Sequence, residues 1–479
     1  ELSPLPLHHP LPFPPFNGTP PITANGNIQV LPSGRKFNTA GTTTFTGNNG
    51  EFRTGPIQTG LTETINNSGE WRDETTGNTR IGNVFGGSFD QGTFNNTGTF
   101  RKTGSATTTI ISVFNNTSSG AGTGVVDLQS ATLNLSGGGG TANSGSSFSG
   151  ANATTLGFGG GGTYNLQSGS SVNAATFALS GGIVNIGGSY SATATSINGT
   201  ANFIAGAVVS TMGALTISGV RANFDTGALV PITTLTIING GTLGGADAVT
   251  VSGQATWIGG AMTGTGTTTF NGDATITANG NVQFLTGGRT LNIVGTLTFT
   301  GNNGDFRGDF FPGLGGTTIN IFGVWIDQTT GTTAIPGSAG GATIRNTGTF
   351  RKTGSATTNI GSVFNNSGTV DIQTGSLSFS GGYTQTAGET KLNGGALSST
   401  TTLNIQGGKL TGAGTVTVCS AIFTPSSAVR TISAVAPPAH SGPLAVASSS
   451  SPVTQSWLFA PGTESSSGAT IQLTLVRNR

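Results

Sequence analysis

The chain has 479 residues, of which 82 are Gly and only 7% are charged, and its formal net charge is +1. Typical soluble proteins carry about 7% Gly and about 25% charged residues. This composition argues against a charge-rich disordered chain, a transmembrane helical protein, a helical bundle and a nucleic-acid binder, because charges, long apolar runs and good helix formers are all scarce. We therefore expect neither a nucleic-acid partner nor a membrane span.

The first segment, residues 1–21, is rich in Pro and predicts an extended, polyproline-like lead-in. It has neither the basic start nor the apolar stretch of a signal peptide. We treat it as separate from the body that follows.

The body contains a long internal repeat. The segment ITANGNIQVLPSGRKFNTAGTTTFTGNNGEFR, which starts at Ile22, recurs in closely similar form from Ile276, and NTGTFRKTGSATT occurs identically at Asn96–Thr108 and Asn346–Thr358. These matches predict a body over residues 22–418 with a repeat of about 250 residues, complete at 22–275 and partial at 276–418.

A shorter period lies within the long one. Asn-Asn doublets begin at Asn48, Asn66, Asn95 and Asn115, and each precedes a short alternating segment such as NNGEFR or NNTGTFRK. A unit of about 20 residues cannot bury its own apolar face, but stacked units can. We therefore predict an all-β, elongated parallel β-solenoid (β-helix) of about twenty coils, with Asn ladders between coils and Gly at the corners.

The alternation assigns side chains to the inside or the outside of the coils. We expect one core residue per coil, in two series: Phe52, Trp71, Phe100, Val126 and Phe306, Trp325, Phe350, Val370. Their neighbours, among them Glu51, Arg53, Glu70 and Arg72, are expected outside. Trp71 and Trp325 could otherwise stack on sugars, but the alternation favours core packing.

Residues 419–479 form a Ser-, Ala- and Pro-rich tail in which Gly becomes rare. This change predicts a tail distinct from the solenoid, either a native cap or a stretch read out of frame. The single Cys, Cys419, is expected to be a small strand residue rather than a reactive thiol.

Segments such as FNNSGTVDIQTGSLSFSGG and LTGAGTVTV resemble the Gly-, Thr- and Asn-rich repeats of large bacterial surface and secreted proteins, the β-solenoid adhesins of the autotransporter-passenger and filamentous-haemagglutinin kind. The resemblance covers about residues 22–418. It implies a non-enzymatic stalk or adhesin segment, extracellular or at the bacterial cell surface. It leaves two partners open: a polysaccharide or cell-surface glycan, and another copy of the chain through open solenoid ends.

The chain has no His between His9 and His440, which excludes Ser-His-Asp catalysis and His-ligated zinc in the solenoid. Calcium-binding GGxGxD repeats are also missing. We expect no cofactor and no metal.

An alternative is a polysaccharide hydrolase or lyase on the same scaffold. Its candidate catalytic residues are Glu51, Glu70, Asp73 and Glu74, and Arg53 and Arg72 beside them are candidate ligand-binding residues. If Glu51 and Glu70 lay one coil apart, at about 4.8 Å, their carboxylates could flank a glycosidic bond. A solvated ladder of Glu and Arg is the favoured interpretation, because Glu70 is replaced by Val324 in the second copy.

The repeated FRKTG suggests a basic patch for acidic glycans, with Arg101, Lys102, Arg351 and Lys352 as its residues, or simply an exposed turn. A further alternative is an ice-binding or filament-forming structural protein. Thr296, Thr298 and Thr300 share one face of their strand, but the Thr-rich segments are not expected on successive coils.

Overall fold

A computed structural model describes residues 21–31, 35–54, 63–82, 92–308, 316–335, 342–423 and 455–457. Within these residues the chain is an all-β parallel β-solenoid of about 18 turns without a helix, which confirms the predicted fold class. The Pro-rich lead-in before Pro21 and most of the tail lie outside the described residues. The chain divides into two compact units, residues 1–232 (unit 1) and 233–479 (unit 2), and each turn of a unit contributes strands to three faces.

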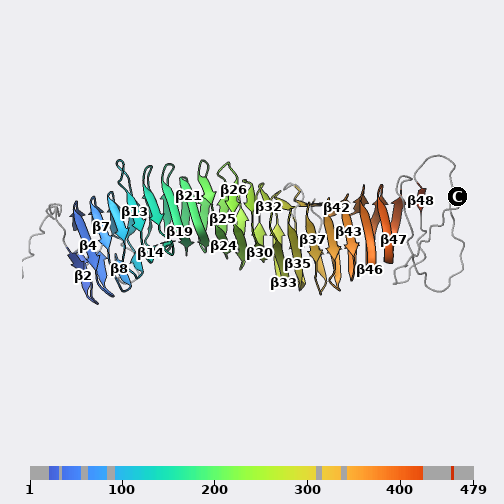
Figure 1. The fold of residues 1–479 in the computed structure, drawn as a ribbon, viewed down its shortest axis with the longest axis horizontal. Helices are drawn as coiled ribbons and strands as arrows, with labels where there is room; N and C mark the ends of the chain where they lie inside the picture. The colour runs from blue at the N-terminus through green and yellow to red at the C-terminus, as the bar shows by residue number, and fades with distance from the viewer. Residues whose placement is uncertain are drawn as a thin grey trace, which may run out of the picture. The chain divides into compact units, whose positions relative to one another are not determined.

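The successive strands of unit 1 pair in parallel with the strands one turn away (Figure 1). Face 1A contains β1 (Pro21–Thr23), β4 (Thr42–Thr46), β7 (Glu70–Asp73), β10 (Thr99–Lys102), β13 (Val125–Leu128), β16 (Ser147–Gly150), the first halves of β19 (Ser171–Leu179) and β21 (Ser189–Ile197), β23 (Val208–Thr211) and, beside β23, β26 (Val230–Ile232). Face 1B contains β2 (Ile28–Leu31), β5 (Glu51–Thr54), β8 (Thr79–Ile81), β11 (Thr108–Ile110), β14 (Thr132–Leu135), β17 (Thr155–Phe158), the second halves of β19 and β21, and β24 (Ala214–Ser218). Face 1C contains β3 (Lys36–Thr39), β6 (Thr64–Asn67), β9 (Thr93–Asn96), β12 (Val113–Asn116), β15 (Gly139–Ala142), β18 (Thr163–Leu166), β20 (Ile183–Ile186), β22 (Thr200–Phe203) and β25 (Arg221–Phe224).

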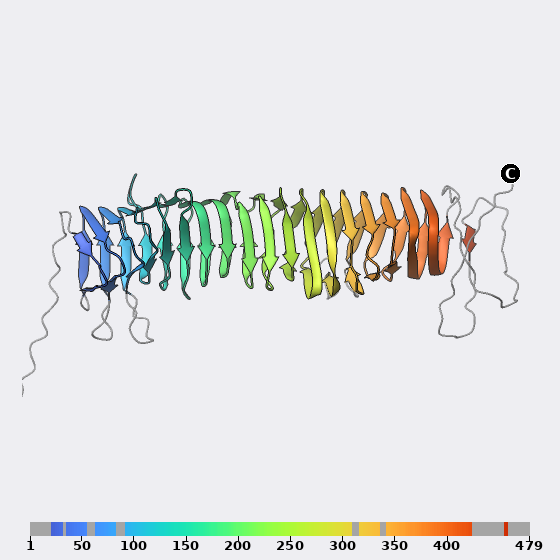
Figure 2. The same cartoon turned by 60° about the horizontal axis from the view of Figure 1, so that its bottom comes forward.

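Unit 2 has the same three-faced arrangement, and Figure 2 shows its strands from a second side. Face 2A contains β27 (Thr234–Ile238), β30 (Ala255–Ile258), the starts of β33 (Ala274–Leu285) and β35 (Thr296–Arg307), β37 (Val324–Asp327), β40 (Thr349–Lys352), β43 (Thr369–Ile372) and the starts of β46 (Glu389–Ile405) and β47 (Lys409–Phe423). Face 2B contains β28 (Thr242–Gly244), β31 (Gly260–Met262), the ends of β33 and β35, β38 (Thr333–Ile335), β41 (Thr357–Ile360), β44 (Ser376–Phe379) and the middles of β46 and β47. Face 2C contains β29 (Val249–Val251), β32 (Thr267–Phe270), β34 (Thr290–Ile293), β36 (Thr318–Ile321), β39 (Thr343–Asn346), β42 (Val363–Asn366), β45 (Tyr383–Gln385) and the ends of β46 and β47, and β48 (Gln455–Trp457) pairs antiparallel with the end of β47.

The strands form because apolar and polar residues alternate over four to five positions between Gly-rich corners. All eight residues predicted for the core are buried, including Trp71 and Trp325. Their rings belong to rows of aromatic contacts inside the coils: Trp71 lies 5.2 Å from Phe94, and Trp325 stacks on Phe350 at 5.7 Å between ring centroids. Core packing of the two Trp is thus confirmed.

The predicted Asn ladder is present on face 1C and is double. On the outer side, Asn66 donates to Asn38 at 2.7 Å and Asn95 donates to Asn66 at 2.9 Å. On the inner side, Asn67 donates to Asn96 at 2.7 Å, and Asn96 continues to Asn116 at 2.8 Å. Each doublet therefore ties its turn to the next on both sides of the strand, in a manner familiar from stacked β structures.

The doublet at Asn48 is an exception, and its assignment to the same column is wrong. Asn48 lies at the corner between β4 and β5, where its backbone N–H donates to the side chain of Asn25 at 3.2 Å. The 18 residues from Asn48 to Asn66 are less than one turn, since the partner of Asn66 on the preceding turn is Asn38, 28 residues away. Register partners elsewhere in this unit are separated by 17 to 29 residues, so a fixed period of about 20 misplaces some segments.

The Gly of the NNTGT motif is required by close approach at a corner. A Cβ on Gly98 would lie 2.0 Å from the carbonyl oxygen of Gly69, one turn earlier. Any side chain there would force the two turns apart, so Gly fixes the tight passage from face 1C to face 1A.

At the carboxyl end, β47 runs to Phe423, past the predicted end of the solenoid at residue 418. Cys419 lies within this strand and is exposed. The prediction that Cys419 is a strand residue is therefore confirmed.

Candidate functional site

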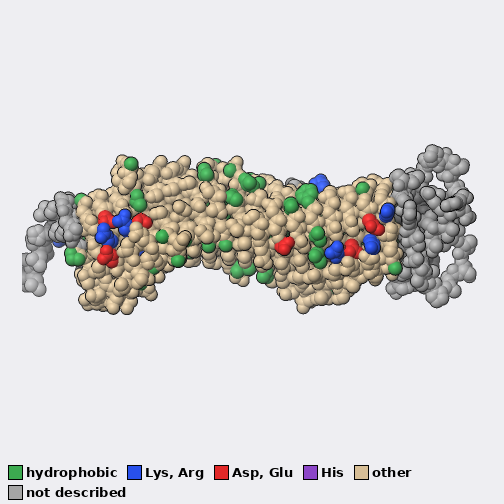
Figure 3. Space-filling model, viewed as in Figure 1, with side chains coloured by type: hydrophobic (Ala, Val, Ile, Leu, Met, Phe, Trp, Pro, Cys, Tyr) green, Lys and Arg blue, Asp and Glu red, His purple; other side chains and the backbone are tan. Residues whose placement is uncertain are grey.

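Charged residues on β7, β10 and β13 form an ion-paired row on the outer side of face 1A. Glu70 on β7 accepts hydrogen bonds from Arg72 on the same strand (2.9 Å) and from Arg101 on β10. Arg101 also donates through Nε to Asp127 on β13 at 3.0 Å. Figure 3 shows blue and red side chains gathered near the amino-terminal end of unit 1. The carboxylates and guanidinium groups of this row therefore bind mainly to one another.

Glu74 follows β7 and lies 3.9 Å from Arg72, at the margin of this row. Arg72 therefore contacts both the half-buried Glu70 and the exposed Glu74, so these two carboxylates of the catalytic hypothesis share one cation. Exposed ion pairs of this kind contribute about 1 kcal/mol or less to stability.

Glu51 does not belong to this row, and the prediction that it stacks on Glu70 is wrong. Glu51 lies on β5 in face 1B, where its strand neighbour one turn away is Arg80, whereas Glu70 pairs with Thr42 and Thr99 in face 1A. Its side chain is bound by Arg53 and approaches Arg80 at 3.8 Å. The spacing of 19 residues between Glu51 and Glu70 is shorter than the turn at this point, so the two carboxylates occupy different faces.

Asp73 is not a surface residue. It is fully buried and forms an ion pair with Lys102, whose Nζ lies 3.3 Å from Oδ2 of Asp73. The carboxylate also accepts hydrogen bonds from the backbone and hydroxyl of Thr75 and from the hydroxyl of Thr108, and Lys102 donates to Thr108 at 3.1 Å. We call Asp73, Thr75, Lys102 and Thr108 the buried ionic cluster of unit 1.

Unit 2 contains the same cluster. Lys352 lies 3.2 Å from Oδ1 of Asp327 and donates to Thr329 at 3.0 Å, while Thr358 donates to Asp327 at 2.6 Å. Both members of the ion pair are fully buried. The prediction that Lys102 and Lys352 belong to an exposed basic patch is wrong, because alternation from Phe100 and Phe350 turns Arg outward and Lys inward.

Burial and the partner Asp act in opposite directions on the pKa of each of these two lysines. Burial lowers the pKa of Lys102 from its usual 10.5, and the charge and hydrogen bond of Asp73 partly offset this effect. Lys352 and Asp327 show the same balance. A buried charge of this kind is tolerated because each Lys is paired with an Asp and also donates a hydrogen bond to a Thr hydroxyl.

Of the proposed basic patch, only the arginines reach the surface. Arg101 is bound as described above, and Arg351 pairs with Asp371 at 3.2 Å. Asp371 also accepts hydrogen bonds from Gln373 and Asn393. Each arginine therefore already has an acidic partner on the next turn, which weakens the case for an acidic-glycan site at these positions.

Thr side chains form a regular outer surface on face 2A. The parallel register aligns Thr236, Thr256, Thr275 and Thr298 on four successive turns, with Thr277 beside Thr300 in the next column. A second column on face 2C contains Thr267, Thr290, Thr318 and Thr343. The three Thr-rich segments singled out in the sequence, at residues 41–47, 105–111 and 266–272, form β4, β11 and β32, which do not pair with one another, as expected. The aligned Thr columns come from other segments, whose register linear spacing does not give.

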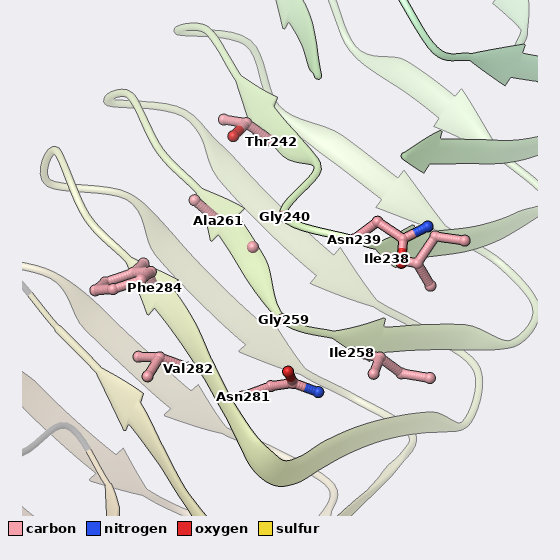
Figure 4. A pocket seen from close by; sticks show the side chains of 11 residues that line it. Ile238, Asn239, Gly240, Thr242, Ile258, Gly259, Ala261, Asn281, Val282 and Phe284 are labelled. Carbon is pink, nitrogen blue, oxygen red and sulfur yellow. The ribbon is translucent and has the colours of Figure 1, made fainter. Parts of the chain in front are cut away.

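A groove of about 740 Å³ lies at the corner between faces 2A and 2B (Figure 4). It is lined by Ile238, Asn239, Gly240, Thr242, Ile258, Gly259, Gly260, Ala261, Asn281, Val282 and Phe284. None of these residues is ionisable. The sequence gives little sign of the groove, since it depends on which corners stack on one another.

Within the described parts of the chain, no three His, Cys, Asp or Glu side chains come together in a group that could hold a metal ion. The described residues also contain no helix that is long and apolar enough to cross a membrane. Comparisons with protein-family models, with curated proteins and with solved structures found no match. The resemblance to bacterial surface proteins therefore rests on the repeat pattern, and the structure supports its β-solenoid component.

Proposed function

We propose that the protein is a non-enzymatic structural or adhesive segment that works outside the cell or at a bacterial cell surface. The observation that carries this proposal is the double Asn ladder, which links successive turns by side-chain hydrogen bonds of 2.7–2.9 Å in addition to the backbone. In repeat proteins stability is a sum of turn stabilities and nearest-neighbour contacts, so such ladders strengthen each interface between turns that they cross. Strengthened contacts between turns suit a scaffold that holds a binding surface away from the cell.

The charged residues support the same proposal. The carboxylates considered for catalysis are bound by Arg53, Arg72, Arg101 and Lys102 within the chain, and Glu51 and Glu70 lie on different faces. A glycosidase needs two carboxyl groups on opposite sides of one bond. The described geometry does not favour the hydrolase or lyase alternative.

The adhesive role is tested by displaying the chain on a non-adherent bacterium and counting attached cells on glycan-coated, protein-coated and bare surfaces. We expect attachment above that of cells displaying an unrelated solenoid of similar length. Cells that attach no better than this control, together with measurable polysaccharide turnover by the purified chain, would contradict the proposal.

Ice binding is a second candidate, which the Thr surface on face 2A favours. Hydroxyl and methyl groups repeat there about every 6.6 Å along a strand and about 4.8 Å between strands, which is the regularity that contact with a crystal requires. Thermal hysteresis of the purified protein is the direct measurement. Thr275→Tyr and Thr298→Tyr should abolish it, whereas Thr109→Tyr on face 1B should leave it unchanged; a protein without hysteresis excludes this candidate.

A further inference from the structure

The groove between faces 2A and 2B arises from a difference in corner length. Thr236 and Thr256 pair on face 2A, and Thr242 and Ala261 pair on face 2B. The corner between the two faces therefore advances by six residues in the first of these turns and by five in the second. In the next turn it advances from Thr275 to Phe284, which is nine residues. The longer corner contributes Asn281 and Val282 to the lining of the hollow.

The tight corners contain glycines, which leave space for the groove because they have no side chain. Gly259 and Gly260 have φ values of 74° and 87°, which side-chain-bearing residues rarely adopt. A Cβ on Gly260 would also lie 2.2 Å from the carbonyl oxygen of Gly241 on the previous turn. Gly is thus required at this corner, and its lack of a side chain leaves the floor of the groove open.

The walls combine apolar surface with amide groups. Thr242, Ala261 and Phe284 occupy one register column, and Figure 4 shows them in a row on successive strands. Phe284 is 36% exposed. On the other side lie Ile238 and Ile258, and the exposed Asn281 lies on the long corner. Small-molecule sites typically show this mixture of apolar walls and a few polar groups, and typical volumes are about 300–1,000 Å³.

We propose that this groove binds a segment of an uncharged polysaccharide. A sugar ring offers an apolar C–H face for Phe284 and the two Ile, and hydroxyl groups for Asn281, whose amide both donates and accepts hydrogen bonds. The lining carries no charge, so the ligand gains nothing from carboxylate or sulfate groups, which would lose their hydration on entry. This proposal deepens the adhesive function proposed above and rests on it.

Other occupants fit the groove less well. An extended peptide cannot add a strand here, because β31 is already paired with β28 on one side and β33 on the other. A second copy of the chain would need about 800 Å² of surface from each partner, which is the scale of a protein interface rather than of a local hollow.

The test measures binding of cello-, malto- and manno-oligosaccharides, with oligogalacturonate as the acidic probe, to the full chain by calorimetry in low and in high salt. Two variants alter the groove: Phe284→Ala removes the ring, and Ala261→Trp fills the floor from an outward position. Phe322→Ala is the matched control, since Phe322 is an exposed Phe of unit 2 outside the lining. Circular dichroism checks that each variant keeps the β-solenoid.

We expect at least one neutral oligosaccharide to bind equally well at both salt concentrations, with affinity at least about tenfold weaker in both groove variants and unchanged in Phe322→Ala. Absence of binding by every neutral probe, equal affinity in the groove variants, or binding only of oligogalacturonate would overturn the proposal. If displayed cells still attach while no oligosaccharide binds, the groove proposal fails and the adhesive function stands. If oligosaccharides bind but displayed cells do not attach, the adhesive function fails.

Discussion

The two copies of the long repeat are alike inside and different outside. Strand β7 reads Glu-Trp-Arg-Asp in unit 1, and its counterpart β37 reads Val-Trp-Ile-Asp in unit 2. The two inward residues, Trp and Asp, are retained, whereas Glu70 and Arg72 are replaced by Val324 and Ile326. On the next turn both copies read Thr-Phe-Arg-Lys, with Lys102 and Lys352 buried against the retained Asp.

The contrast between retained inward residues and replaced outward residues indicates which residues the fold needs. A buried Lys without its Asp would leave an unpaired charge, so the inward pair is a structural requirement once either member is present. The outward positions of β7 carry two members of an ion-paired row, whereas those of β37 carry Val324 and Ile326, and both are compatible with the same coil. The outer face of the solenoid is therefore where the two units can differ in what they contact.

The largest effect is expected when one member of the buried Asp–Lys pair is removed in either unit. Asp73→Ala and Asp327→Ala should each lower the free energy of unfolding by about 3–5 kcal/mol, because the partner Lys is left charged and buried. The loss should be similar in the two units, as their contacts are nearly identical. Denaturant unfolding monitored by Trp fluorescence measures it.

Asp127→Ala is the control for the first prediction, since Asp127 forms an exposed pair with Arg101 and should cost about 1 kcal/mol or less. The double variant Lys102→Met with Asp73→Leu should recover most of the loss, because no charge remains buried. If Asp73→Ala and Asp127→Ala cost the same, the buried cluster has no special structural role.

Most of this inner arrangement was open to prediction from the sequence. Alternation places Trp71 inside, Arg72 outside and Asp73 inside, and the same rule turns Lys102 inward after Phe100. The charge of Asp73 and Lys102 suggested a surface position instead. Burial of such residues is rare unless they are paired, and their pairing depends on a register that linear spacing does not give.

The register itself was only partly predictable. The doublets at Asn66, Asn95 and Asn115 do stack, but the turns between them have 29 and 20 residues, so the number of residues per turn is not constant. For this reason Asn48, Phe52 and Glu51 were assigned to the wrong column. The groove could not be predicted at all, since it depends on corners of unequal length lying next to each other.

High pH should reveal a second shared feature, since all three Tyr of the chain are buried: Tyr164 and Tyr190 in unit 1 and Tyr383 in unit 2. Burial raises the pKa of each phenol above its usual 10.0. The folded state thus keeps protons that the unfolded state releases above pH 10.0, so stability is full below that pH and is lost as pH rises further. The lowered pKa values of Lys102 and Lys352 act in the opposite direction, because they add stability as the pH rises towards 10.5, and so they make the start of the decline more gradual.

Absorbance of tyrosinate and circular dichroism should therefore change together in an alkaline titration. Tyr190→Phe and Tyr383→Phe should shift the unfolding of their own units to higher pH. Tyrosinate that forms before the β signal is lost would show that the phenols are accessible in the folded state.

The two Asn ladders of face 1C offer a smaller and more local contrast. Asn96→Ala removes inner hydrogen bonds to Asn67, Asn116 and the carbonyl of Val125, and it leaves buried partners unsatisfied at a cost of about 1–3 kcal/mol. Asn95→Ala removes only outer bonds, where water can replace the partner, and should cost about 0.5–1.5 kcal/mol. Hydrogen exchange at β9 and β12 separates the two, and equal protection in both variants would mean that the inner ladder adds nothing.

The smallest effect is expected for two outward carboxylates of unit 1, Glu70 in the ion-paired row of face 1A and Glu51 on face 1B. The double variant Glu51→Gln with Glu70→Gln removes half-buried carboxylates that bind arginines on the outer side of the coil, so the free energy of unfolding should fall by about 1 kcal/mol or less. Unit 2 folds with Val324 at the position of Glu70, which supports this expectation. The same variant separates scaffold from enzyme, because hydrolysis or elimination on a polysaccharide would need these carboxylates and should disappear with them, whereas attachment of displayed cells should persist. Polysaccharide turnover by the unchanged protein that vanishes in the double variant, at equal purity and with the fold intact, would replace the proposed scaffold with an enzyme.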